Sequence, residues 1–368
     1  MRILLLGEYS NVHATLGQAL KTLGHDVTVL SNGDFWKDYP RDIDLVRRPG
    51  KIGGLRYFWK VKRLLPHLRD YDVVQLINPM FLELKANRLF SIYRTLRHQN
   101  ANMFLGGFGM DWYWLSTCRT EKHLRYSDFN IGDTLRTDAC AMEEVADWCD
   151  TPKERLNRMI AEDCDGIICG LYEYWTCYDH HFKEKSTYIP FPIDCTDPPV
   201  VRQDIPTQLK VFIGINKNRS AYNGTDIMLR EAQAIAAEHP EDMILTVAES
   251  VPFEQYQRLL DDSDVLLDQL YSYTPAMNAL MAMSKGILCI GGGEPEHYEF
   301  LREHHCRPIL NVKPEDGSVR SALEYLISHK EEIPRLRQES QAYVIRHHDA
   351  CHVAEKYLRF WNERGRNR

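Results

Sequence analysis

Short apolar runs alternate with amphipathic stretches along most of the chain. Residues 2–6 form one run, apolar positions at helical spacing follow over 12–23, and a second run occupies 26–30. Apolar runs of this length are typical of strands buried in a parallel sheet. The first thirty residues therefore predict a strand–helix–strand unit.

A proline-rich segment divides the alternation into two blocks. Four prolines fall between positions 190 and 199, and a polar stretch extends to Gln208, which is a composition typical of a linker. We therefore expect an α/β protein with two doubly wound, Rossmann-like domains that face a cleft, and a final amphipathic helix. Further strands are expected at 73–77, 103–105, 166–169, 209–214, 243–247, 265–267 and 286–290, helices at 226–237 and 349–367, and domains at 1–195, 196–345 and 346–368.

The composition is that of an ordinary globular protein. Hydrophobic residues make up 44%, charged residues 26%, and the net charge of −7 disfavours a nucleic-acid binder. Without a leader-like start or a run of about 18 apolar residues, the ten cysteines are expected to be reduced thiols of a cytoplasmic protein. Adjacent histidines on a helix diverge by about 100°, so we expect no metal site.

Charge is distributed unevenly, with a basic excess in residues 47–97. Twelve Arg and Lys residues stand there against three acidic ones, giving +9. Within 55–65, basic side chains alternate with aromatic and aliphatic ones, a pattern that suits an anionic membrane surface. A solvated basic helix face is the other interpretation, so peripheral membrane association at the inner face is an expectation.

The loop after strand 265–267 carries the signals of a helix amino end. Thr274 is expected to cap the helix and Pro275 to occupy its first turn. The N–H groups of Ala276, Met277 and Asn278 would then lack intrahelical partners and attract a diphosphate. An ordinary capped helix is the alternative.

Several motifs along the chain match one known family. They are Met281-Ala282-Met283-Ser284-Lys285-Gly286, Gly292-Gly293-Glu294-Pro295-Glu296, Phe212-Ile213-Gly214 followed by Asn223-Gly224-Thr225-Asp226, Ile189-Pro190-Phe191-Pro192-Ile193-Asp194, and Gly24-His25-Asp26-Val27-Thr28-Val29-Leu30. Together they resemble glycosyltransferase family 4, whose members have the GT-B fold. The resemblance implies a C-terminal helix that packs back toward the first domain. The likeness is strong over 205–300 and looser over 1–195.

The resemblance implies transfer of a sugar from a nucleoside diphosphate sugar, bound by the second domain, to an acceptor bound by the first. It implies a glycan or lipid-linked glycan acceptor, a role in surface polysaccharide assembly, retention of anomeric configuration, and no cofactor beyond the donor. Two glutamates of the family fall here on Tyr273 and Met281. Asp268 or Glu296 are the candidate substitutes, and a catalytically silent nucleotide-sugar or glycan binding protein stays open.

A basic loop follows the strand that ends at Gly214. In the family, an Arg and a Lys of this loop neutralise the leaving diphosphate, so the resemblance implies metal-independent transfer. Arg219 is the candidate arginine, because its fork can hold two phosphate oxygens. The lysine position holds Asn223, which leaves Lys217 as the replacement.

Two loops of the first domain are candidates for acceptor contacts. The loop after the first strand contains Gly7, Tyr9, Ser10, Asn11 and His13, and lacks the Gly-x-Gly-x-x-Gly spacing, which disfavours a nicotinamide-dependent oxidoreductase. The second loop spans 106–114 and combines glycines with aromatic residues. Its Asp111 is expected to act as a catalytic base or to bind a sugar hydroxyl.

Overall fold

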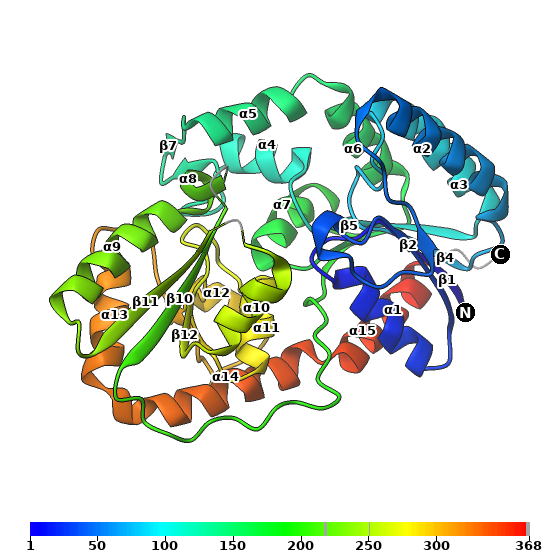
Figure 1. The fold of residues 1–368 in the computed structure, drawn as a ribbon. Helices are drawn as coiled ribbons and strands as arrows, with labels where there is room; N and C mark the ends of the chain where they lie inside the picture. Colours follow the sequence, from blue (N-terminus) through cyan, green and yellow to red (C-terminus); the bar gives the residue numbers. More distant parts are fainter. Residues whose placement is uncertain (217–218, 250, 366–368) are drawn as a thin grey trace. The chain divides into compact units, whose positions relative to one another are not determined.

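The computed structural model describes residues 1–216, 219–249 and 251–365, which form two compact units (Figure 1). Unit 1 comprises residues 1–123, 144–192 and the chain from Ala350 onward. Unit 2 comprises residues 124–143 and 193–349. The expected first domain thus lacks segment 124–143, which groups with unit 2.

Unit 1 is built on a seven-stranded parallel sheet in the order β3-β2-β1-β4-β5-β8-β9. The chain builds outward from β1 in one direction and then returns to place β4 on its other side. This reversal leaves a crevice at the carboxyl ends of β1 and β4, which is where open α/β sheets bind ligands. The strands are β1 (Arg2–Leu6), β2 (Asp26–Ser31), β3 (Ile43–Asp44), β4 (Val73–Leu76), β5 (Asn102–Gly107), β8 (Gly166–Cys169) and β9 (Ser186–Tyr188).

Helices cover both faces of this sheet. Apolar residues of α2, α3 and α6 form one core with the strands, and α1 and α15 lie together on the other face (Figure 1). The helices are α1 (Val12–Thr22), α2 (Gly50–Leu64), α3 (Ala86–Gln99), α4 (Trp112–Thr120), α6 (Pro152–Asp163), α7 (Tyr172–Phe182) and α15 (Ala350–Arg364), while α5 (Ala139–Trp148) spans the boundary between the units.

The C-terminal helix α15 packs on unit 1, as expected. Its Trp361 is 1% exposed and donates from its indole N–H to Gln75 Oε1 at 3.3 Å. The ring of Phe360 lies so close to Gly166 that a Cβ there would stand 2.7 Å from it. A glycine in β8 therefore lets the helix approach the sheet.

Unit 2 contains a five-stranded parallel sheet in the order β11-β10-β12-β13-β14. Helices α9 and α13 share a core with one face, and α11 packs against α14. The strands are β10 (Leu209–Ile215), β11 (Met243–Glu249), β12 (Val265–Leu267), β13 (Leu288–Gly291) and β14 (Leu310–Asn311). The helices are α8 (Ser220–Asn223), α9 (Thr225–Glu238), α10 (Phe253–Asp261), α11 (Met277–Ser284), α12 (Pro295–Phe300), α13 (Ser318–Ser328) and α14 (Ile333–His348).

Segment 124–143 adds an element that the hydrophobic pattern did not predict. It contains an antiparallel hairpin formed by β6 (Asn130–Ile131) and β7 (Thr134–Leu135). Arginines on both sides of the hairpin contact the carboxyl edge of the unit 2 sheet, so the segment belongs to the surroundings of a candidate site.

Candidate functional site

A pocket of about 1080 Å³ opens in unit 1 at the reversal of its strand order. Gly7 and Glu8 after β1, Asn32 after β2 and Ile77 after β4 all contribute to its wall. Gly7 has φ +91°, and a Cβ there would lie 2.2 Å from the Ile77 side chain. Only glycine fits this backbone position, which holds the turn that opens the pocket.

The polar groups at the base of the pocket bind one another. Glu83 accepts a hydrogen bond from the Asn32 amide, and its backbone N–H donates to the Tyr57 hydroxyl at 3.2 Å. Glu8 accepts from the N–H of Ala14 at 2.8 Å. Burial raises the pKa of Glu8 to about 8, so this carboxyl is mostly uncharged at neutral pH.

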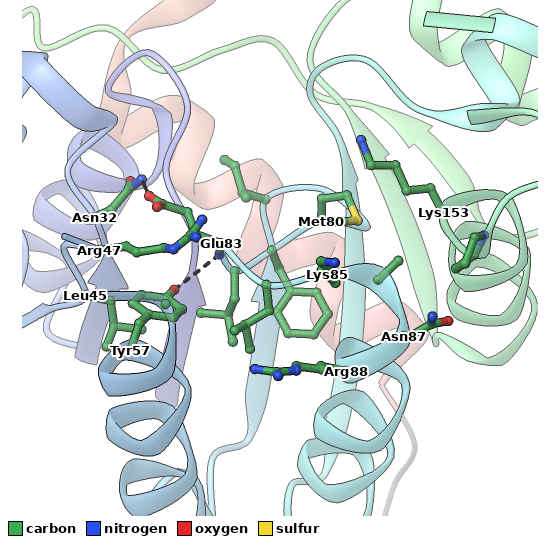
Figure 2. Close-up of a pocket in the computed structure, with 18 of the residues that line it drawn as sticks. Asn32, Leu45, Arg47, Tyr57, Met80, Glu83, Lys85, Asn87, Arg88 and Lys153 are labelled. Carbon is green, nitrogen blue, oxygen red and sulfur yellow. Dashed lines mark hydrogen bonds between the residues drawn. The ribbon is translucent and has the colours of Figure 1, made fainter. Parts of the chain in front are cut away.

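Basic side chains surround the opening. Arg47 and Arg88 extend toward the middle of the pocket from opposite sides (Figure 2). Lys51 and Lys85 also line it, as does Lys153, which pairs with Asp147. The polar groups at the bottom of the pocket are therefore largely hydrogen-bonded to one another, and basic side chains form its rim.

Of the five residues predicted to contact an acceptor, Gly7 and Tyr9 line this pocket. Ser10 and Asn11 adopt left-handed backbone conformations in the turn before α1, and the Ser10 N–H donates to Asp34 at 2.9 Å. His13 is fully buried, and its Nδ1 lies 2.8 Å from the Gly7 carbonyl oxygen. Burial lowers the pKa of His13 to about 3, so it is a neutral histidine of the interior.

Asp111 caps helix α4 rather than facing solvent. Its Oδ1 accepts from the Trp114 N–H at 2.9 Å, its Oδ2 accepts from the Tyr178 hydroxyl at 2.8 Å, and its exposure is 0%. Burial raises the pKa of Asp111 to about 7. In this structure the carboxyl organises the end of β5 and does not reach a surface where an acceptor could lie.

In unit 2, the space above Gly214 is filled by an aromatic ring. A Cβ at Gly214 would stand 2.6 Å from the ring of Tyr256 in α10. The Tyr256 hydroxyl donates to Asn278 Oδ1 at 3.1 Å, and burial raises the pKa of this tyrosine to about 12. Gly214 is thus explained by packing, and Tyr256 links it to the first turn of α11.

Helix α11 begins at Met277, later than the sequence predicted. Ala276 is its N-cap, with φ −85° and ψ 178°, and no side chain caps it. The prediction that Thr274 caps the helix and Pro275 opens it is therefore wrong. The carbonyl of Tyr273 accepts from the Glu294 N–H at 3.1 Å, which keeps this stretch in the preceding loop.

Asp268 lies beside the first turn of α11. It is 8% exposed, and its Oδ2 has no hydrogen-bond partner within the described chain. Burial raises the pKa of Asp268 to about 6, and a hydrogen bond from Asn278 opposes that shift. A buried carboxylate oxygen without a donor is the kind of group that a ligand hydroxyl satisfies.

Arg219 is exposed at the start of α8, and its guanidinium lies 4.7 Å from the centre of the Tyr222 ring. Lys217 lies outside the described residues. Asn223, at the lysine position of the family, accepts from the Leu270 N–H through its backbone carbonyl at 3.0 Å. Its neighbour Gly224 has φ +73° and joins α8 to α9.

Tyr273, at a glutamate position of the family, forms part of a cluster that sequence reasoning missed. The guanidinium of Arg125 lies 5.2 Å from its ring centre, and the Arg125 N–H donates to its hydroxyl at 2.7 Å. Arg125 also pairs with Glu296 and with Glu294, the latter at 2.6 Å. The Tyr126 hydroxyl donates to Glu294 at 2.6 Å. Glu296, predicted to bind donor, is therefore engaged in an ion pair.

The other side of the hairpin holds the Arg219 loop. Arg136 donates to the carbonyls of Ala221 at 2.6 Å and Tyr222 at 3.1 Å, and its guanidinium lies 4.0 Å from the centre of the Tyr271 ring. Segment 124–143 therefore ties α8 to the loop before α11. Its signal in the sequence is no more than two arginines around a short polar stretch.

No cluster of three or more His, Cys, Asp or Glu side chains in the described residues could hold a metal ion. Among the same residues, no helix has the length and apolar character needed to cross a membrane.

Comparison with known proteins identifies the fold. No family model matches the sequence, and no curated protein matches it. Among solved structures, HepE of Anabaena in complex with UDP and glucose is 11% identical, with a TM-score of 0.61 over 99% of this chain and 100% of HepE. Sucrose-phosphate synthase from Thermosynechococcus elongatus is 12% identical, with a TM-score of 0.63 over 99% of each chain.

A third match is larger than this chain. A TarM variant of S. aureus, in complex with fondaparinux, alpha-GlcNAc-glycerol and UDP, is 10% identical with a TM-score of 0.55. The match covers 82% of this chain and 58% of TarM. At such identities the likeness concerns architecture. The chain has the GT-B fold, with two doubly wound α/β units and a C-terminal helix that returns to the first.

Proposed function

We propose that the protein is a glycosyltransferase that uses a nucleoside diphosphate sugar, with the donor bound by unit 2 and the acceptor by unit 1. The observation that carries this proposal is the carboxyl edge of the unit 2 sheet. There an uncapped helix end, a buried carboxylate oxygen without a donor, and an exposed arginine belong to neighbouring loops of a GT-B protein.

Each of these groups suits one part of the donor. The first-turn N–H groups of α11 suit phosphate oxygens, since a helix amino end carries partial positive charge. Arg219, with Lys217 as its predicted companion, would neutralise the charge that grows on the diphosphate as the sugar–oxygen bond breaks. Because protein cations would supply this stabilisation, transfer is expected to proceed without a divalent metal.

Asp268 is the better candidate for the missing glutamate contact. Its Oδ2 has no donor within the described residues, whereas Glu296 is held by Arg125. A ribose or sugar hydroxyl could donate to Asp268. Met281, at the glutamate position, could not accept this hydrogen bond in its place, because a thioether is a weak acceptor. Gly214, Thr274, Pro275 and Ala276 would then shape the site through their backbone.

The acceptor is proposed to be a glycan or lipid-linked glycan, and the reaction a retaining step of surface polysaccharide assembly. Helix α2 supports contact with an anionic membrane, because Ile52, Leu55 and Trp59 are 71%, 54% and 57% exposed. Arg56, Lys60 and Arg63 lie with Leu55 and Trp59 along one surface groove. This pairing of apolar and basic side chains suits the headgroup region.

A panel of nucleotides tests donor binding. HepE was solved with UDP-glucose, which makes uridine compounds the first to try, followed by adenosine and guanosine diphosphates. A ligand at a hundred times its dissociation constant should stabilise the protein by about 2.7 kcal/mol, measured as a shift in Tm. If no nucleoside diphosphate or nucleotide sugar stabilises the protein, donor binding by unit 2 is wrong.

A further inference from the structure

We infer that the unit 1 pocket binds a phosphate group, and that the acceptor is a phosphate-bearing glycan or lipid. Calling this ligand the acceptor rests on the proposed transfer reaction. Phosphate binding itself rests only on the charge and geometry of the pocket, and can be tested without any donor.

The charge of the pocket is clearly positive. Five basic side chains line it against the two acidic residues Glu83 and Asp147, a formal excess of about +3. Glu8 adds little negative charge because burial raises its pKa to about 8. A ligand with two negative charges would balance most of this excess.

Four of the basic side chains have no carboxylate partner among the described residues. Within the part of the chain that the structure describes, Arg47, Lys51, Lys85 and Arg88 form no salt bridge. By contrast, Arg97 on the same helix as Arg88 pairs with Asp165 at 2.6 Å. Arginines and lysines that converge on a pocket without pairing with its acidic residues are arranged for an external anion.

Backbone N–H groups at two helix amino ends add to the positive electrostatic potential of the pocket. Helices α2 and α3 both begin at the pocket, where Lys51 and Gly54 of the first and Ala86 and Asn87 of the second line it. Neither helix has an acidic residue in its first turn or a side-chain cap. The Arg88 N–H donates to the Lys85 carbonyl at 2.8 Å, and the N–H groups before it in the first turns of the two helices are placed for a phosphate oxygen.

Apolar side chains also line the pocket and would contact the part of the ligand that carries no phosphate. Leu45, Met80, Phe81 and Leu82 line it, and Leu55 belongs both to this pocket and to the surface groove with Trp59. A sugar ring could lie against this wall, and a lipid chain could leave along α2. A soluble phosphorylated glycan and a lipid phosphate share the chemistry that the pocket selects.

The experiment compares a phosphorylated probe with its neutral counterpart. Glucose 1-phosphate and glucose are titrated into the full chain by calorimetry, and phosphatidylcholine vesicles with and without a long-chain isoprenyl monophosphate are tested by co-sedimentation. The variant Arg47→Gln/Arg88→Gln removes two rim cations. Arg69→Gln/Arg94→Gln removes the same charge from exposed positions of unit 1 that do not line the pocket.

We expect glucose 1-phosphate or the lipid phosphate to bind, and the Arg47/Arg88 variant to bind at least tenfold more weakly than the Arg69/Arg94 control. Binding of the sugar phosphate assigns a soluble ligand, and binding of only the phosphate vesicles assigns a lipid. Equal binding of glucose and glucose 1-phosphate, equal affinity of the two variants, or no binding of either phosphate overturns the inference. UDP titrated in parallel should bind all forms alike, so failure of the donor proposal would appear separately.

Discussion

Asp268 is held in the fold in an environment that disfavours its charge. Its pKa rises from 3.8 to about 6, so between these values the unfolded chain ionises while the folded one stays protonated. The free energy of unfolding therefore falls as pH rises through this range. Above pH 6 the full decrease of about 3 kcal/mol is reached. A stability cost of this kind is typical of a buried carboxyl group that binds a ligand.

Asp268→Asn should consequently stabilise the protein and impair donor binding. At pH 7.5 we expect up to about 3 kcal/mol more unfolding free energy than in the wild type, and near pH 4 well under about 1 kcal/mol. Urea melts at both pH values measure this, with the exposed Asp316→Asn as control. A variant that binds nucleoside diphosphates as tightly as the wild type would remove Asp268 from the donor site.

Arg219→Ala tests the cation at the start of α8. Loss of a hydrogen bond to a charged phosphate should weaken diphosphate binding by roughly 1.5–3 kcal/mol. The transfer rate should fall further, because more negative charge sits on the diphosphate in the transition state. Calorimetry and turnover measure the two effects, with Lys217→Ala in parallel. Unchanged binding and turnover in the Arg219 variant would exclude this residue.

The sequence predicted site residues correctly only where neighbouring residues in the chain determine their conformation. The glycine after β1 follows from the strand pattern, and its φ of +91° agrees with it. The start of α11 was placed too early because the bond from Glu294 to the Tyr273 carbonyl is a long-range contact. Asp111 and His13 were expected to face ligand, but burial depends on packing that no local pattern reveals.

At the scale of elements, the hairpin of segment 124–143 is the main feature that the sequence did not predict. Its two strands have two residues each, too short for a period-2 pattern to register. Its arginines bind partners far away in sequence, as Arg125 and Glu294 are 169 positions apart. Longer strands and helices were predictable because their apolar periodicity is local, and the runs at 2–6, 166–169 and 265–267 are confirmed with the same limits.

Arg125→Ala should destabilise unit 2 through Glu294. That carboxylate is 1% exposed and, among the described residues, would keep the hydrogen bonds from Tyr126 and Asn311. Loss of its cation should cost roughly 1–3 kcal/mol. Adding Glu294→Gln should recover part of the loss, because no charge is then left without a cation. Urea unfolding of the four forms measures this coupling. Strictly additive losses would contradict the role given to this pair.

Helix α2 is the element that tests membrane contact. Arg56, Lys60, Lys62 and Arg63 changed together to Gln should abolish co-sedimentation with anionic vesicles, since each basic residue contributes about 1 kcal/mol near such a surface. Binding of nucleoside diphosphates by unit 2 should not change. Neutral vesicles serve as the control. A wild-type protein that never sediments with anionic vesicles would make this helix a solvated basic face.

For the whole molecule, the alternation of apolar runs and amphipathic stretches was enough to predict two doubly wound α/β domains, and the motifs that resemble glycosyltransferase family 4 added the GT-B fold. The matches at 10–12% identity agree with it across most of the chain. Architecture alone leaves the chemistry open, because one fold hosts many functions. The proposed chemistry therefore depends on the unit 2 edge and the unit 1 pocket, and on whether protein cations replace a metal.

Release of nucleoside diphosphate from a panel of uridine, adenosine and guanosine diphosphate sugars, measured in the presence of a chelator, tests this account most directly. We predict release from at least one donor, faster with a phosphate-bearing acceptor, and a loss of at least tenfold in the Arg219→Ala variant, which corresponds to about 1.4 kcal/mol of transition-state stabilisation. Release that stops with chelator and returns with manganese would contradict the metal-independent mechanism. A protein that releases nucleoside diphosphate from none of these donors, with or without metal, would contradict the account as a whole.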